Sequence, residues 1–346
     1  MAGLSAAARA RELGAEPVVF EKGDRAGGSM LLSSGVVWRY RTLEGFRAEC
    51  PKGDPALQRP IVERLDEGIA WLESLGARVV ARATGNPRTV GMRFDPRSLR
   101  DALVRASSPI RLNTSFTGSD PVKTATSRTV LATGGFPVRL ARERGLLLRA
   151  NRWSEGDGLD LGRGRGAATA GDLEEFYGRA MPAPLREVAE EDFVRLAQLY
   201  GRFATVTSED GEQVFEGPPD WSETDLVQVI ARWPGGRAWY VVEPAAQRQK
   251  VRAQTVAQMI EAARAAGATI RREGDRVSVL VQASVTQTLG GLAIDERARV
   301  LAEDGSPVEG LYAAGADMGG ISNGGWSSGL AAALVFGRIA AEEAVS

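Results

Sequence analysis

Gly3 and Glu21 are the first residues whose types and spacing could serve chemistry. Gly3 opens an alanine-rich stretch, and Glu21 follows eighteen residues later within "EPVVFEK". A glycine at a helix start lets a pyrophosphate approach the free N–H groups and the positive end of the helix dipole. An acid about 20 residues further along, at the tip of the next strand, can accept hydrogen bonds from a ribose. The pair therefore fits the second half of a dinucleotide-binding motif, with an ordinary helix–strand turn as the alternative.

Four glycine-rich segments, widely separated along the chain, point the same way. They are "EKGDRAGGSMLLSSG", "VLATGGF", "GDGLDLG" and "GLYAAGADMGG". Glycine-rich turns at the carboxyl ends of strands are where open α/β sheets bind ligands. Any single glycine here could be a turn, but the ordered set predicts a nucleotide cofactor.

In this order the segments resemble the flavoprotein family of fumarate reductases, 3-ketosteroid dehydrogenases and related FAD-dependent desaturases, over nearly the whole chain. The resemblance implies noncovalent FAD, with its adenosine end at Gly3 and Glu21 and with Lys22 beside the acid. Free N–H groups at the start of the last helix would stabilise a reduced, anionic flavin. The other cofactor contacts that the resemblance implies are Gly27, Gly28, Ser29, Ser33, Ser34, Gly35, Thr133, Gly134, Gly135, Asp157, Gly158, Gly315, Asp317, Ser328, Gly329 and Leu330.

The substrate residues follow this family less closely. In "TQTLGG", Gln287 takes the place of a family histidine, and "SNGGWSS" lacks the arginine with which fumarate reductases hold a carboxylate. The stretch "PPDWSETD" has no clear equivalent of their proton-donating arginine. Because a dicarboxylate loses its cationic clamps, fumarate and succinate are disfavoured as substrates. Trp326 stands where ketosteroid dehydrogenases have a tyrosine, which indicates either an apolar wall for a bulkier substrate or a packed residue at a helix entry.

Three further residues complete the predicted catalytic set with Gln287 and Trp326. Tyr177 and Arg179 lie in "FYGRAMP", and Tyr240 lies in "RAWYVV". A phenol or a guanidinium can polarise a carbonyl or move a proton without histidine. For Tyr240 the alternative is a buried strand residue of the capping domain.

The composition excludes several kinds of chemistry. None of the 346 residues is a histidine, which excludes Ser-His-Asp and Cys-His catalysis, the usual zinc sites and histidyl attachment of a cofactor. The single Cys50 permits no internal disulfide and fits a reducing compartment. With 43 basic and 44 acidic residues, no electrostatic argument favours nucleic acid. No apolar run approaches the roughly 20 residues that span a bilayer, so we expect a cytoplasmic protein without a metal site.

The element pattern predicts an α/β fold, in which a Rossmann-like FAD-binding domain carries an inserted α+β capping domain. The predicted domain ranges are 1–172 and 276–346 for the FAD-binding domain and 173–275 for the capping domain. The first strand of the fold and its first two glycines are absent. Either Met1 is an internal methionine of the motif and the true start lies upstream, or the chain is a decayed relative.

Periodicity predicts the main helices. They cover 3–14, 61–77 and the long amphipathic stretch 245–268, and a last helix begins near Ser327. Residues 114–128 form a shorter connection than the family has between the corresponding strands.

These features predict an FAD-dependent oxidoreductase acting on a CH–CH bond next to a carbonyl, by dehydrogenation or by alkene reduction. Its partners would be an apolar or bulky small-molecule substrate and an unidentified electron donor or acceptor. Two alternatives stay open. One is a truncated or decayed relative that binds flavin weakly or not at all, and the other is a flavin oxidase or hydroxylase with the same cofactor fold.

Overall fold

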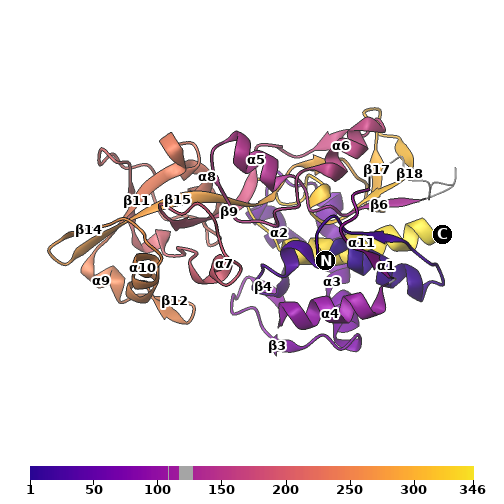
Figure 1. The fold of residues 1–346 in the computed structure, drawn as a ribbon, viewed down its shortest axis with the longest axis horizontal. Helices are drawn as coiled ribbons and strands as arrows, with labels where there is room; N and C mark the ends of the chain where they lie inside the picture. Colours follow the sequence, from indigo (N-terminus) through magenta and orange to yellow (C-terminus); the bar gives the residue numbers. More distant parts are fainter. Residues whose placement is uncertain (108, 117–127) are drawn as a thin grey trace. The chain divides into compact units, whose positions relative to one another are not determined.

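The computed structural model describes residues 1–107, 109–116 and 128–346. Most of the short connection predicted over 114–128 lies outside these ranges. Helices and strands alternate through the described chain (Figure 1). This alternation confirms the predicted α/β class.

The chain divides into two compact units, each built from separated segments. Unit 1 comprises 1–136, 151–175 and 287–346, and unit 2 comprises 137–150 and 176–286. Unit 2 thus extends beyond the predicted capping domain of 173–275. It adds residues 137–150 before that range and residues 276–286 after it. Within the described residues, no helix combines the length and the apolar character needed to cross a membrane.

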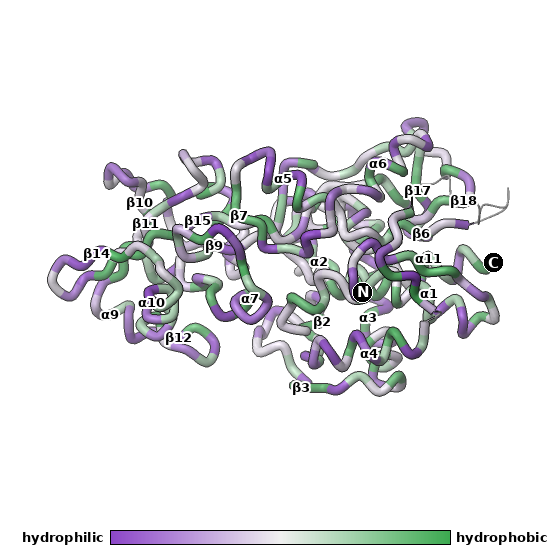
Figure 2. The backbone as a smooth tube through the Cα atoms, in the orientation of Figure 1, coloured by the Kyte–Doolittle hydropathy of each residue, from purple (hydrophilic) through white to green (hydrophobic). Residues whose placement is uncertain are grey.

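Unit 1 is built around two helices of small and apolar residues, α1 (Ala2–Glu12) and α11 (Gly329–Val345). They lie side by side in Figure 1, and Ala6 and Ala10 pack against Ala341. The tube of α11 is mostly in the hydrophobic colours of Figure 2. A Cβ atom at Gly337 would lie only 2.6 Å from the carbonyl oxygen of Ala2. Glycine therefore lets α11 come close to the first turn of α1 and fix its direction.

Of the four other helices that the structure describes in unit 1, three begin at a side-chain cap. The Asp54 side chain accepts a hydrogen bond from the N–H of Ala56, and that of Asp95 accepts one from Ser98; a proline follows each cap. Aspartate caps and proline in the first turn are the usual start of a helix. These helices are α2 (Leu43–Glu49), α3 (Pro55–Ser74), α4 (Pro96–Ala106) and α6 (Asp157–Gly164), with 3₁₀ turns η1 (Gly28–Met30) and η4 (Gly315–Asp317).

The strands of unit 1 are short. They are β1 (Val19–Phe20), β2 (Val36–Tyr40), β3 (Val79–Ala81), β4 (Thr89–Phe94), β5 (Ile110–Arg111), β6 (Thr129–Leu131), β8 (Thr169–Ala170), β16 (Gly291–Leu292), β17 (Arg299–Leu301) and β18 (Pro307–Ala313). Parallel pairing joins β1 to β5 and β6 to β18, and β17 adds to β18 as an antiparallel hairpin. The parallel pairs place the predicted cofactor loops at strand ends.

Unit 2 is organised around one long strand, β15 (Arg276–Thr288). The four-strand order is β10 (Thr205–Thr207), β11 (Arg237–Val242), β15 and β14 (Ile270–Glu273), and both β7 (Leu147–Leu148) and β9 (Phe176–Pro182) also pair with β15. Apolar side chains from β7, from β9 and from the residues just after α7 (Asp192–Arg195) form one core cluster. The other helices are α5 (Pro137–Glu143), α8 (Thr224–Ile230), α9 (Pro244–Gln247) and α10 (Val256–Ala265), with 3₁₀ turns η2 (Gly201–Phe203) and η3 (Pro234–Gly236).

The predicted helix over 245–268 is wrong. The structure has α9, then a small hairpin of β12 (Lys250–Val251) and β13 (Gln254–Thr255), and only then α10. Arg252 adopts a left-handed conformation, with φ of 56°. Thr255 and Gln258 form a reciprocal capping box that starts α10. The local signal of a helix start overrides the amphipathic period here.

Candidate functional site

Asp317 joins three of the segments predicted to contact FAD. Its side chain is 1% exposed and accepts hydrogen bonds from the N–H of Thr133, from the Thr133 hydroxyl at 2.7 Å and from the N–H of Gly134 at 3.1 Å. The Thr133 hydroxyl also accepts a bond from the N–H of Gly158 at 3.1 Å. Burial raises the pKa of Asp317, and these hydrogen bonds oppose the rise. One buried carboxyl group thus fixes the end of β6, the turn η4 and the first turn of α6.

The glycines around Asp317 leave the backbone bare. Gly134 and Gly135 have φ of 96° and 71°. A Cβ atom at Gly135 would lie 2.7 Å from the carbonyl oxygen of Ala316, and one at Gly158 would lie 2.3 Å from Oδ1 of Asp317. Only glycine fits these positions, where the absence of side chains lets backbone segments and a ligand approach closely. Gly315 packs in the same way against the start of α1, where its Cβ would be 3.0 Å from Cβ of Ala2.

The start of α1 lies close to Glu21, as the predicted motif requires. Burial lowers the pKa of the Met1 amino group to about 6, and the charge of Glu21 opposes this fall. Gly3 sits in the first turn, where a Cβ atom would be 3.3 Å from that of Ala132 after β6. Oε1 of Glu21 accepts a hydrogen bond from the N–H of Gly23 at 2.8 Å. These contacts place an acid beside a helix start, which is the arrangement of a nucleotide site.

Lys22 links this corner to the first turn of α6. Its Nζ lies 3.1 Å from Oδ2 of Asp157 and also contacts Glu155. The structure therefore brings together Lys22 and Asp157, two residues that were predicted from segments far apart in the sequence.

The loop after β1 is shaped by its glycines and by Ser33. Gly27 has φ of 119° and Gly28 has φ of 51°. The hydroxyl of Ser33 donates to the carbonyl of Met30 at 2.8 Å and accepts from the N–H of Gly35 at 3.1 Å. Ser29 lies in η1, and the carbonyl of Ser34 accepts a bond from Nε of Arg93 at 3.1 Å. The loop is a set of tight turns that offers backbone groups to a ligand.

Gln287 lies against the start of α11. Ser328 caps this helix by accepting a hydrogen bond from the N–H of Ala331 at 3.2 Å. A Cβ atom at Gly329 would lie 2.2 Å from Oε1 of Gln287. The first N–H groups of a helix, here those of Gly329 and Leu330, have no partner within the helix. The predicted glutamine and the predicted flavin-facing turn are therefore neighbours.

The loop that carries Trp326 is held from two sides. The hydroxyl of Tyr40 donates to the carbonyl of Trp326 at 2.6 Å. The carboxylate of Glu175 accepts bonds from Nδ2 of Asn323 and from the N–H of Gly324, both at 2.7 Å. The Trp326 side chain is half-buried. A fixed loop with a partly open indole fits both predicted roles, wall and packing.

The other predicted catalytic residues belong to unit 2. Arg179 is 8% exposed; its guanidinium lies 4.9 Å from the centre of the Tyr177 ring, and Nη1 donates to the carbonyl of Ser222. β9 thus brings an arginine to "PPDWSETD", the stretch that itself has none. Tyr240 is fully buried, and in the described chain its hydroxyl has no hydrogen-bond partner. Burial raises the pKa of nearby Glu223 to about 7, with Arg179 opposing the rise.

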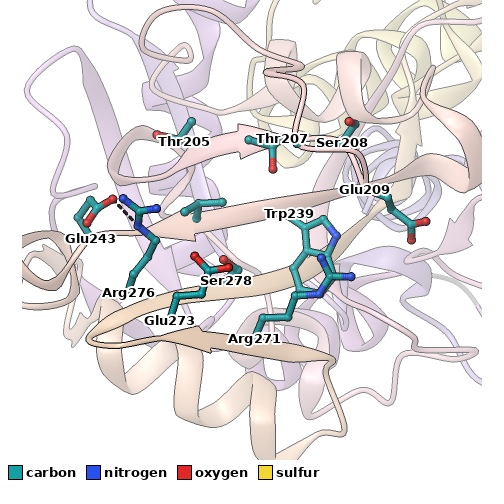
Figure 3. Close-up of a pocket in the computed structure, with 12 residues that line it drawn as sticks. Thr205, Thr207, Ser208, Glu209, Trp239, Glu243, Arg271, Glu273, Arg276 and Ser278 are labelled. Carbon is teal, nitrogen blue, oxygen red and sulfur yellow. Dashed lines mark ion pairs between the residues drawn. The ribbon is translucent and has the colours of Figure 1, made fainter.

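A shallow pocket of about 360 Å³ lies on one face of the unit 2 sheet (Figure 3). The guanidinium of Arg271 stacks 3.9 Å from the centre of the Trp239 ring, and Arg276 pairs with Glu243 at 2.8 Å. Alternation along a strand places Trp239 on the face opposite Tyr240. None of the predicted site residues lines this pocket.

Sequence reasoning missed Arg149, a buried arginine of unit 2. It follows the apolar run Leu146–Leu148 directly, in "LLLRAN". An arginine that continues a buried strand is the signal that could have found it, since arginine is rarely fully buried without a partner.

The fold and this site define a flavoprotein of the FAD binding domain family. The sequence profile of that family matches residues 1–124 and 107–329, so the chain belongs to it. FAD is the cofactor of this family, and the resemblance found in the glycine-rich segments is confirmed. The residues present fit FAD, because two helix starts, a glycine cradle and a buried carboxyl group converge within unit 1.

Two curated relatives match short segments. NADH:acrylate oxidoreductase of Vibrio harveyi is 51% identical over 65 residues, which are 18% of this chain and 6% of that protein. Fumarate reductase of Schizosaccharomyces pombe is 44% identical over 61 residues, which are 17% of this chain and 12% of that protein. The matched segments thus span a small part of either relative.

Solved structures share the fold over almost the whole chain. A flavocytochrome c3 fumarate reductase in its open conformation has a TM-score of 0.73 at 21% identity, covering 99% of this chain and 76% of that one. The 3-ketosteroid Δ1-dehydrogenase from Sterolibacterium denitrificans has a TM-score of 0.72 at 15% identity, covering 99% and 97%. The predicted Rossmann-like fold of the FAD-binding flavoproteins is confirmed.

Proposed function

We propose that this chain is an FAD-dependent oxidoreductase acting on a CH–CH bond next to a carbonyl group. The observation that carries the proposal is the Asp317 cluster, in which one buried carboxyl group joins segments around Thr133, Gly158 and Gly315 into a bare backbone cradle. Family membership supports FAD as the ligand of this cradle. The names of its relatives, an acrylate oxidoreductase, fumarate reductases and ketosteroid dehydrogenases, support the reaction class.

Unit 1 supplies the groups that would hold the cofactor. Gly3 and Glu21 would take the adenosine end, Asp317 the ribityl chain, and the N–H groups of Gly329 and Leu330 the pyrimidine edge. FAD supplies hydride transfer when bound. The N–H groups at the start of α11 favour negative charge beside them, because they lie at the positive end of the helix dipole.

The chain's own residues would handle the proton and the substrate. Tyr177 and Arg179 are the proposed proton-transfer groups, since neither needs a histidine, and Tyr240 is a further candidate beside Glu223. Gln287 would hydrogen-bond to the substrate carbonyl, and Trp326 would form an apolar wall. A single cysteine, Cys50, permits no disulfide within the chain and supports a cytoplasmic location.

The test uses the full chain purified with added FAD. We expect a stoichiometric flavin spectrum, and reoxidation of the photoreduced protein by compounds with a C=C bond conjugated to a carbonyl, but not by fumarate. Asp317→Ala should lose flavin, whereas Asp304→Ala, at an exposed turn, should retain it. A folded but colourless chain would refute the proposal, and fast fumarate turnover would refute its substrate argument.

A further inference from the structure

The pocket of unit 2 lies on the polar face of four paired strands. Two of its lining residues, Trp239 and Ser278, alternate along β11 and β15 with Tyr240 and Val279, which are fully buried on the opposite face. The floor of the pocket is therefore a sheet that packs on a core behind it. Its volume of about 360 Å³ lies near the lower end of the range for small-molecule sites, roughly 300–1,000 Å³.

Trp239 brings a buried donor without an acceptor to this pocket. The residue is 3% exposed, and within the described chain its Nε1 has no hydrogen-bond partner. The guanidinium of Arg271, an exposed residue, lies beside it, 3.9 Å from the centre of the ring (Figure 3). A buried tryptophan N–H usually finds a partner. A ligand that displaces the mobile end of Arg271 and places an oxygen beside the indole would supply that partner.

The charged groups of the pocket carry both signs. Arg276 pairs with Glu243 at 2.8 Å and lies opposite Glu273 in the register of β14 and β15. In all, three glutamates and two arginines line the pocket, together with four serine and threonine residues. An anion would meet carboxylates here and a cation would meet guanidiniums, so like-charge repulsion opposes either. The lining therefore favours a ligand that is uncharged and rich in hydrogen-bonding groups.

We propose that this pocket binds an uncharged polyhydroxylated ring, which is the chemistry of a sugar. Each hydroxyl of such a ring can both donate and accept, so it can bond to carboxylates, guanidiniums and hydroxyls alike. One ring oxygen or hydroxyl would accept from Nε1 of Trp239, and the C–H groups of the ring would pack on Val241, the aliphatic side chain of the lining. The site lies within unit 2 and goes beyond the proposed function, because it needs neither the cofactor residues nor the proposed catalytic residues.

The test follows the indole N–H resonance of Trp239 by NMR in the full chain with added FAD. The sugars titrated are glucose, galactose, xylose and maltose, and a Trp239→Phe variant assigns the resonance. We expect at least one sugar to move this resonance with a Kd on the order of 1 mM, because Nε1 gains an acceptor. A single free sugar as ligand predicts similar affinities for glucose and maltose, and a longer saccharide chain predicts maltose binding at least about tenfold tighter. Either result supports the proposal.

Two neighbouring arginines of β14 provide matched variants. Arg271→Gln removes the guanidinium beside Trp239 and should weaken sugar binding about tenfold, as loss of a hydrogen bond to a charged group implies. Arg272→Gln changes the next residue, whose side chain alternates to the other face of the strand, and should leave the affinity unchanged. Both arginines are exposed, so both variants should fold.

Three results would overturn the proposal. The first is a Trp239 resonance that none of the four sugars moves at concentrations up to about 50 mM. The second is tighter binding of sulfate or of ethylammonium, as single ions of either sign, than of every sugar. The third is an equal loss of sugar affinity in Arg271→Gln and Arg272→Gln, which would show that the sugar does not bind on the Trp239 face.

Discussion

Replacing Glu223 by glutamine should remove a defined part of the pH dependence of folding. Glu223 is 3% exposed, and burial raises its pKa from 4.5 to about 7, against the opposing charges of Arg179 and Arg202. Because the folded pKa lies above the unfolded value, the stability contribution is full below pH 4.5 and is lost as the pH rises through about 7. Between pH 5 and pH 8 the loss amounts to about 2.5 kcal/mol, at about 1.4 kcal/mol per pH unit.

The assay is urea unfolding of the full chain and of Glu223→Gln at pH 5, 6, 7 and 8, followed by tryptophan fluorescence. The difference in unfolding free energy between the two proteins should shift by about 2.5 kcal/mol in favour of the variant across this range. Any constant effect of the new amide cancels in that shift. The matched control is Glu187→Gln, an exposed glutamate of unit 2, which should show no such shift. A flat difference curve for Glu223→Gln would refute the burial argument.

Two further substitutions test the geometry of unit 1. Asp317→Ala should lower the unfolding free energy by about 2–5 kcal/mol in urea titrations, because it leaves the N–H groups of Thr133 and Gly134 without their acceptor; a loss below about 1 kcal/mol would contradict the bonding described. Gly329→Ala should destabilise the chain, because the new Cβ would press against the Gln287 side chain. This destabilisation should largely disappear in a Gln287→Ala background. Strict additivity of the two substitutions in a double-mutant cycle would show that the two side chains do not touch.

The glycine-rich segments that identify the family could be recognised because backbone geometry restricts their sequence. Gly135 and Gly158 occupy positions where a Cβ atom would strike the carbonyl oxygen of Ala316 or the side chain of Asp317, so their type is dictated by the fold. Such constraints leave glycines at fixed places along the chain, and their order identifies the family. The pattern also predicted a last helix beginning near Ser327, and α11 begins at Gly329 after the cap Ser328.

The rest depended on contacts that no local pattern encodes. The hairpin within 245–268 required Arg252 to adopt a left-handed conformation, which its residue type does not suggest. Arg149 was unremarkable in the sequence because arginine is usually a surface residue. Its burial follows from the pairing of β7 with β15 and from the position of the Phe193 carbonyl, and both are long-range events. Sequence patterns therefore located the backbone cradle, but the charges of unit 2 had to be found in three dimensions.

Those charges bear on how a chain without histidine could move protons. A free histidine titrates near pH 6.5. In a chain without histidine, a side chain titrates near neutral pH only when its pKa is shifted, for example by burial. Burial gives Glu223 a pKa of about 7. Nearby are Arg179 and the hydroxyl of Tyr240, which has no hydrogen-bond partner among the residues that the structure describes. A glutamate in this environment can exchange a proton at neutral pH. Unit 2 thus combines a neutral-range acid with an excess of buried positive charge, and both properties arise from burial of residues that would be ordinary on the surface.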